Sequence, residues 1–106
     1  MNKLEYIKDI STGIETISYE NVNISYPEHT HIGHLVFGIV TEGKVGVKID
    51  QEEFVCNEGE MFSIALNMKH SIYPITDFYS MISICLPQED NVDRELDIIR
   101  REIIGN

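Results

Sequence analysis

Apolar residues follow two different periods along this chain. From Leu4 to about Leu86 they recur mostly at every second position, and Gly, Asn, Asp or Pro interrupts them every ~8–12 residues. This pattern is typical of the short strands of an all-β sandwich or barrel. After Pro87 a helical period takes over, with one apolar stripe formed by Val92, Leu96, Ile99 and Ile103. We therefore expect a β-barrel over residues 1–88 and an amphipathic helix over residues 89–106.

Turn residues divide the barrel region into individual strands. Residues 14–19 and 22–26 are predicted as strands, the second of them ended by Pro27, which has no N–H to give to a sheet. Residues 35–41 form a nearly continuous apolar run and are expected in a central strand. Turn chemistry predicts breaks at Glu42-Gly43, at Asp50-Gln51 and at residues 57–60. The remaining predicted strands are residues 45–49, 53–56, 61–64, 71–73 and 78–86.

Composition and charge exclude several classes of function. The 106 residues suit a single domain, and 18 acidic residues against 8 basic ones give a net charge of −10. Such a surface repels phosphate backbones, so we expect no direct binding of nucleic acid. The N-terminal residues are polar, and no apolar run approaches the ~18 residues of a membrane span. We expect a cytoplasmic protein in which Cys56 and Cys85 are reduced thiols in the core.

The histidines are the candidate functional residues. His29 and His31 are two positions apart, so an extended strand would put both imidazoles on one face. His34 follows closely, and His70 comes after the predicted strand 61–64 and a loop. These are all four histidines of the chain, and a small barrel would bring them together at one pocket.

Their spacing resembles the two sequence motifs of the cupin family. In the first motif His-x-His is followed after a short gap by Glu and then by Gly; here Val36 stands at the Glu position and Gly43 follows. In the second motif Gly59 and His70 keep the expected spacing, while Ala65 and Asn67 replace a Pro and a Gly. The resemblance implies a double-stranded β-helix, or jelly-roll, barrel.

The order of segments is closer still to the N-terminal sensor domains of AraC-type transcription regulators. Residues 26–31 (Tyr-Pro-Glu-His-Thr-His), the strand 36–43 and the segment 59–70 follow the order of that family. The resemblance implies a barrel that binds a small-molecule effector, and a helix that forms a homodimer and leads to a separate DNA-binding domain. We therefore expect the sensor portion of a longer regulator. The helical stripe could instead pack on the outside of the barrel.

Three readings of the histidine cluster remain open. Three or four neutral imidazoles, His29, His31, His34 and His70, could hold Zn²⁺, Ni²⁺, Fe²⁺ or Mn²⁺. Val36 supplies no carboxylate, and His34 is then the substitute ligand. The same histidines could line an effector pocket without metal, or be solvated at the barrel mouth. The expected effector-binding residues are His29, His31, His34, Val36, Phe37, Phe62, His70 and Tyr73.

A metal site and a metal-free effector pocket would point to two different classes of function. A metal site would fit a small stand-alone cupin enzyme of the dioxygenase or isomerase type. No Ser-His-Asp order, phosphate loop or nucleophilic cysteine motif suggests another chemistry. The sensor function accounts for more features, including the terminal helix, and we favour it.

Overall fold

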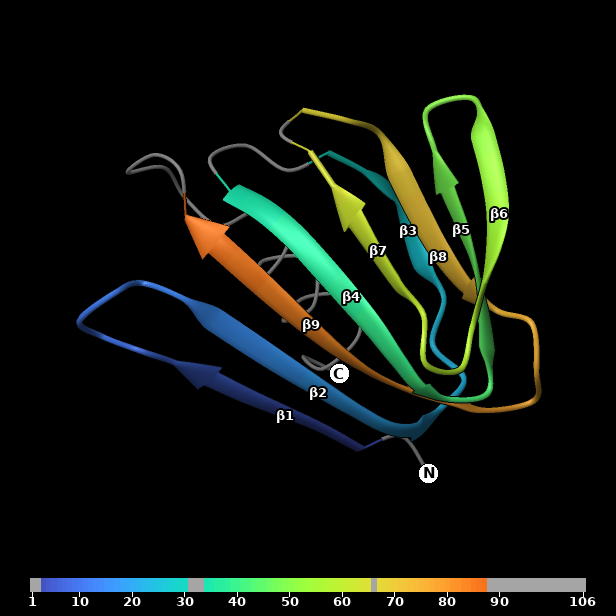
Figure 1. The fold of residues 1–106 in the computed structure, drawn as a ribbon, viewed down its shortest axis with the longest axis horizontal. Helices are drawn as coiled ribbons and strands as arrows, with labels where there is room; N and C mark the ends of the chain where they lie inside the picture. The colour runs from blue at the N-terminus through green and yellow to red at the C-terminus, as the bar shows by residue number, and fades with distance from the viewer. Residues whose placement is uncertain (1–2, 31–33, 66, 88–106) are drawn as a thin grey trace.

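The computed structural model describes residues 3–30, 34–65 and 67–87, with the backbone alone for His34. This part of the chain forms nine antiparallel strands in two sheets (Figure 1). One sheet has five strands in the order β1-β2-β9-β4-β7, and the other has four in the order β3-β8-β5-β6. The strands are β1 (Lys3–Lys8), β2 (Glu15–Val22), β3 (Tyr26–His29), β4 (His34–Glu42), β5 (Lys44–Ile49), β6 (Glu52–Asn57), β7 (Met61–Ile64), β8 (His70–Pro74) and β9 (Tyr79–Pro87).

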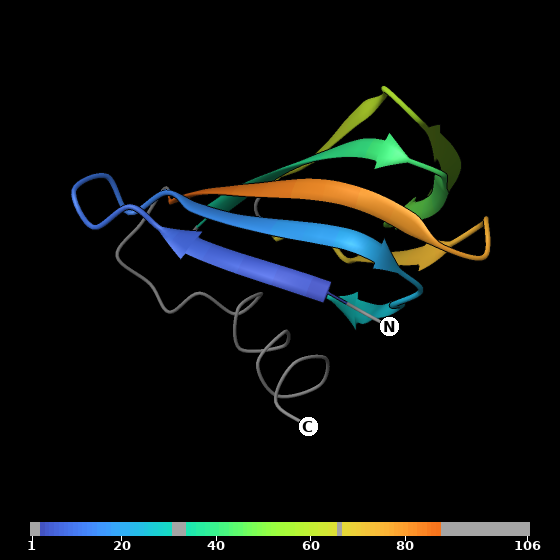
Figure 2. The same cartoon turned by 90° about the horizontal axis from the view of Figure 1, so that it is seen from below.

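The core lies between the two sheets and follows the alternation of side chains along each strand. In β4, Val36 and Val40 are buried, whereas Phe37 and Ile39 between them are only half-buried. Val45 and Val47 contribute to the same core from the opposite sheet. Figure 2 shows β1, β2, β9 and β4 side by side along the length of the molecule, as their register requires. The all-β architecture predicted from the sequence is confirmed.

Several local predictions are confirmed as well. The apolar run 35–41 lies in β4, which is hydrogen-bonded to β9 on one side and β7 on the other. The turns at Glu42-Gly43 and Asp50-Gln51 contain left-handed residues, Gly43 at φ 75° and Asp50 at φ 53°. Cys56 and Cys85 are buried in β6 and β9. Burial, and secondarily the charge of Glu60, raises the pKa of the Cys56 thiol.

One strand prediction is wrong. Val22 ends β2, residues 23–25 belong to no strand, and Pro27 lies inside β3 instead of ending a strand before it. The position tolerates proline because β3 is at the edge of its sheet and its register with β8 shifts between Tyr26 and His29. At edge strands and bulges a residue need not donate its N–H to a neighbouring strand, so proline costs no hydrogen bond there.

The predicted helix at 89–106, with its stripe Val92, Leu96, Ile99 and Ile103, lies outside the described residues. The division between a barrel at 1–88 and a helix after it therefore stays a prediction. Within the described residues, no helix has the length and hydropathy that crossing a membrane requires.

Candidate functional site

Two of the predicted site residues, His29 and His70, face each other across neighbouring strands. The antiparallel register of β3 and β8 pairs them directly. Their ring centroids are 4.1 Å apart, with an angle of 60° between the ring planes. His70 is also paired with Ile49 of β5 and is only 1% exposed. The sheet register thus brings together two imidazoles that lie far apart in the sequence.

Backbone carbonyls fix the orientation of both rings. His29 Nδ1 lies 2.6 Å from the carbonyl oxygen of Pro27, and His70 Nδ1 lies 3.1 Å from that of Met68. A carbonyl oxygen only accepts, so each Nδ1 must carry the proton that it donates. In the neutral ring Nε2 then holds the lone pair, and it is the atom that can accept a hydrogen bond or bind a metal. The pair therefore presents two oriented acceptor nitrogens.

A group of buried tyrosines adjoins the imidazole pair inside the barrel. The ring of Tyr26 lies 5.5 Å from that of His29, and Tyr19 lies 6.3 Å from Tyr26, with their hydroxyls hydrogen-bonded to each other. Tyr79 is 6.4 Å from Tyr19 and donates its hydroxyl to the carbonyl of Ile24 at 2.8 Å. Burial strongly raises the pKa of Tyr79, so this hydroxyl stays protonated as a donor.

Sequence reasoning did not name Tyr19 as a site residue, although a signal was present. Tyr19 lies two positions after Ile17 in β2, and both side chains are buried in the core. The strand period therefore places the tyrosine on the inner face. What the period alone does not give is its proximity to Tyr26, because the two residues belong to different sheets.

The four other described candidates divide between the two faces of the sheets. Val36 and Phe62 are buried in the core, where the Phe62 ring covers Gly38. Phe37 and Tyr73 lie on the outer faces, so the structure does not bring them to the imidazoles. They alternate with residues that point inward: Phe37 follows Val36, and Tyr73 follows Ile72.

Tyr73 has a partner of its own on the outer face. Its ring covers Gly46, and its hydroxyl donates to the Glu53 carboxylate. This hydrogen bond is the main reason that the pKa of Tyr73 is raised. The contact joins β8 to β6 across β5. This structural role explains the position of Tyr73 without a bound ligand.

The predicted metal set is only partly within the described residues. His31 and the side chain of His34 fall outside them, and among the described side chains no three of His, Cys, Asp and Glu gather as a metal site. The oriented Nε2 atoms of His29 and His70 are of a type that Zn²⁺ or Ni²⁺ binds, but a site would need further donors. Val36, at the expected carboxylate position, is an apolar core residue. The predicted metal site, and the metal-dependent enzyme function that would require it, stay predictions.

Known structures show which fold this chain has. The chain is similar to KdgF from Halomonas sp., with a TM-score of 0.71 at 16% identity over 84% of this chain and 81% of that one. It is also similar to an RmlC-like cupin family protein with a double-stranded β-helix fold from Methanocaldococcus jannaschii, with a TM-score of 0.70 at 18% identity over 92% and 86% of the two chains. The fold is that of a cupin barrel, as the sequence predicted.

The family within that class is also established. The profile of the AraC-like ligand binding domain matches residues 11–102, and the chain belongs to this family. An HTH_3 family transcriptional regulator from Vibrio cholerae shares the fold, with a TM-score of 0.68 at 15% identity; the match covers 83% of this chain and 51% of the regulator. A comparison with curated protein sequences found no significant match.

Proposed function

We propose that this chain is the effector-binding and dimerisation domain of an AraC-like transcription regulator. Membership of the AraC-like ligand binding domain family supports the sensor role. We place the effector site at the imidazole pair His29–His70, because both Nδ1 atoms are hydrogen-bonded to the backbone and the rings are thereby oriented. The effector is a small molecule that donates hydrogen bonds to the Nε2 atoms. With a net charge of −10, the chain itself is not the part that contacts DNA.

The position of His29 suggests how binding is transmitted. His29 lies on β3, an edge strand whose described hydrogen-bonded neighbour is β8 alone. A strand held from one side shifts at lower cost than one held from both sides. A ligand that contacts both imidazoles favours one arrangement of β3 against β8 and thereby changes the population of two states of the domain. The helix predicted at 89–106 would form the dimer, and the dimer would transmit this change of state to the rest of the regulator.

A thermal-shift screen of the purified chain tests ligand binding. The compounds are monosaccharides, organic acids and small aromatic acids, each added separately. A compound at about ten times its Kd stabilises the native state by about 1.4 kcal/mol, which raises the Tm of a domain of this size by roughly 5–10 °C. We expect such a shift from one class of compound. The proposal is contradicted if none of these classes moves the Tm.

Dimerisation is expected to depend on the stripe of the predicted C-terminal helix. Replacing both Leu96 and Ile99 with Lys puts two charges among apolar positions and should convert a dimer to a monomer in sedimentation velocity. The control carries the same charge change outside the stripe, with Gln88 and Asn91 replaced by Lys. It should remain dimeric. A wild-type chain that sediments as a monomer, or a Leu96→Lys/Ile99→Lys variant that stays dimeric, would exclude this role for the helix.

A further inference from the structure

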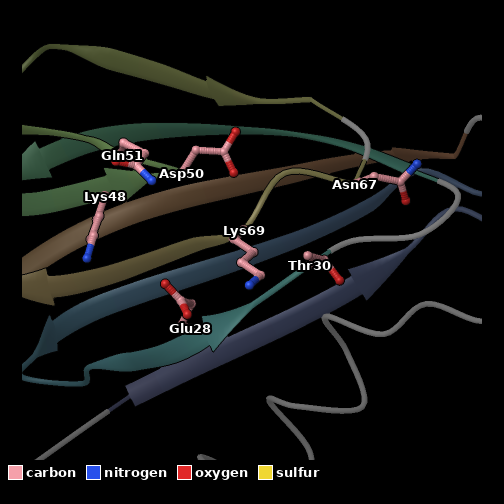
Figure 3. A pocket seen from close by; sticks show the side chains of 7 residues that line it. All are labelled: Glu28, Thr30, Lys48, Asp50, Gln51, Asn67 and Lys69. Carbon is pink, nitrogen blue, oxygen red and sulfur yellow. The ribbon is translucent and has the colours of Figure 1, made fainter.

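A second candidate site lies outside the imidazole pair, in a cleft of about 780 Å³. The cleft is formed at the end of the four-stranded sheet, where β3 and β5 finish and β8 begins (Figure 3). Lys48 is exposed and follows the inward-facing Val47, which places it on the outer face of the sheet. The described lining consists of polar residues alone: Glu28, Thr30, Lys48, Asp50, Gln51, Asn67 and Lys69.

The rim of the cleft is held in place by the backbone. The amide of Asp50 donates to the carbonyl of Lys69 at 2.7 Å, which joins the β5–β6 turn to the start of β8. The pairing of His29 with His70 joins the end of β3 to the same place. Asp50 and Asn67 both have left-handed backbones, with φ of 53° and 63°. A rim tied together in this way loses little conformational freedom when a ligand binds.

Among the residues that the structure describes, the charged side chains of the cleft have no ion-pair or hydrogen-bond partner. It contains two lysines, Lys48 and Lys69, and two carboxylates, Glu28 and Asp50. Across residues 3–30, 34–65 and 67–87, the only ion pair within 4 Å joins Lys3 to Glu20. None of the four cleft side chains makes a hydrogen bond in this part of the chain. All four line the same cleft, so groups of both signs border it; in Figure 3, Glu28 and Asp50 lie on opposite sides of the two lysines in the view.

This balance of charge selects the class of ligand. The chain carries a net charge of −10 and only eight Lys and Arg residues, yet the described lining of the cleft has as many cations as anions. A simple anion would meet two carboxylates, and a simple cation would meet two ammonium groups. No aromatic ring belongs to the described lining, so a sugar ring or a nucleobase would find no stacking surface there. A small molecule with one charge of each sign satisfies both pairs.

We propose that this cleft binds a zwitterionic amino acid, separately from the barrel interior. The ligand carboxylate accepts hydrogen bonds from the ammonium groups of Lys48 and Lys69, and its ammonium group donates to Glu28 and Asp50. The side-chain amides of Gln51 and Asn67 contact its polar atoms.

The proposal is tested by titrating the ¹⁵N-labelled full chain with each free L-amino acid and following amide chemical shifts. We expect saturable shifts at the cleft residues with at least one amino acid, and little change with the corresponding N-acetyl amino acid amide, which lacks both charges. The Lys48→Gln/Lys69→Gln variant should weaken that binding by about tenfold or more. The Glu28→Gln/Asp50→Asn variant should weaken it similarly, and Asn tolerates the left-handed backbone at position 50.

Matched controls separate this site from non-specific charge and from the barrel. A Lys8→Gln/Lys44→Gln variant removes two exposed lysines elsewhere and should bind as wild type does. Absence of shifts with all free amino acids would overturn the proposal, as would undiminished binding by Lys48→Gln/Lys69→Gln. Equal shifts with acetate alone would overturn the zwitterion class. These variants do not alter His29 or His70. A negative result for the cleft would therefore not contradict the effector site proposed at the imidazole pair.

Discussion

Replacing Gly43 with alanine should destabilise the barrel by about 3 kcal/mol or more, since two costs combine at this turn. Gly43 has φ 75°, which costs an L-residue about 1–2 kcal/mol. A Cβ atom there would also lie 2.6 Å from the Phe78 carbonyl oxygen and 2.6 Å from Thr76 Oγ1. Thr76 is not able to move away cheaply, because its hydroxyl accepts from the Lys44 amide at 3.0 Å and bonds to the Phe78 carbonyl at 2.7 Å. Urea unfolding followed by circular dichroism measures the loss.

Gly59→Ala is the matched control for Gly43. Gly59 has a similar left-handed backbone, with φ 85°, but a Cβ atom there would meet nothing within 4 Å. It should therefore show the backbone cost alone, about 1–2 kcal/mol. The difference between the two variants measures the contact of the β4–β5 turn with the loop before β9. If Gly43→Ala costs no more than Gly59→Ala, that contact does not constrain the native state.

The second large effect is expected at Gly38, in the middle of β4. A Cβ atom at this position would lie 2.3 Å from Phe62 Cζ and 2.5 Å from another ring carbon, and the Phe62 side chain is only 5% exposed. The ring has no free space to turn into, so Gly38→Ala should cost about 2–3 kcal/mol by overpacking. Gly46→Ala makes an equally short contact with the ring of Tyr73, but that ring is half-buried on the outer face and can swing toward solvent. It should cost less.

A double-mutant cycle isolates the Gly38 contact. Phe62→Leu alone removes buried ring atoms and should destabilise the chain, whereas in the Gly38→Ala background the smaller side chain relieves the clash. We expect the double variant to be more stable than the sum of the two single effects by about 1 kcal/mol or more in urea unfolding. Strict additivity would show that Phe62 does not cover Gly38 in solution.

The spacing of short strands and turns was sufficient to predict an all-β domain, and the motif resemblance added the cupin barrel. Burial alternates along β9 from Met81 to Leu86, as a strand with one face in the core requires. The failure at Pro27 has a tertiary cause. Whether a strand can contain proline depends on its being at an edge, and the edge position of β3 follows from its pairing with β8, more than forty residues away. Local sequence carries no information on that pairing.

The candidate site was predicted in part, for similar reasons. The motif spacing correctly indicated that His29 and His70 meet. Val36 and Phe37 were both predicted to line the pocket. Neighbouring side chains of a strand point to opposite faces of the sheet, so only one of the two can face the pocket. The cleft was missed altogether. Its lining comes from three separate segments and consists of polar residues that, in sequence, are indistinguishable from ordinary exposed strand ends and turns.

The proposed effector contacts the Nε2 atoms of His29 and His70. The most direct measurement is the ¹⁵N chemical shift of the imidazole nitrogens, with and without the compound that raises the Tm most in the screen. We predict that the Nε2 signals of both rings shift on binding, while both Nδ1 atoms keep their protons on the carbonyls of Pro27 and Met68. A compound that binds and leaves both Nε2 signals unchanged would contradict the assignment of the imidazole pair as the effector site.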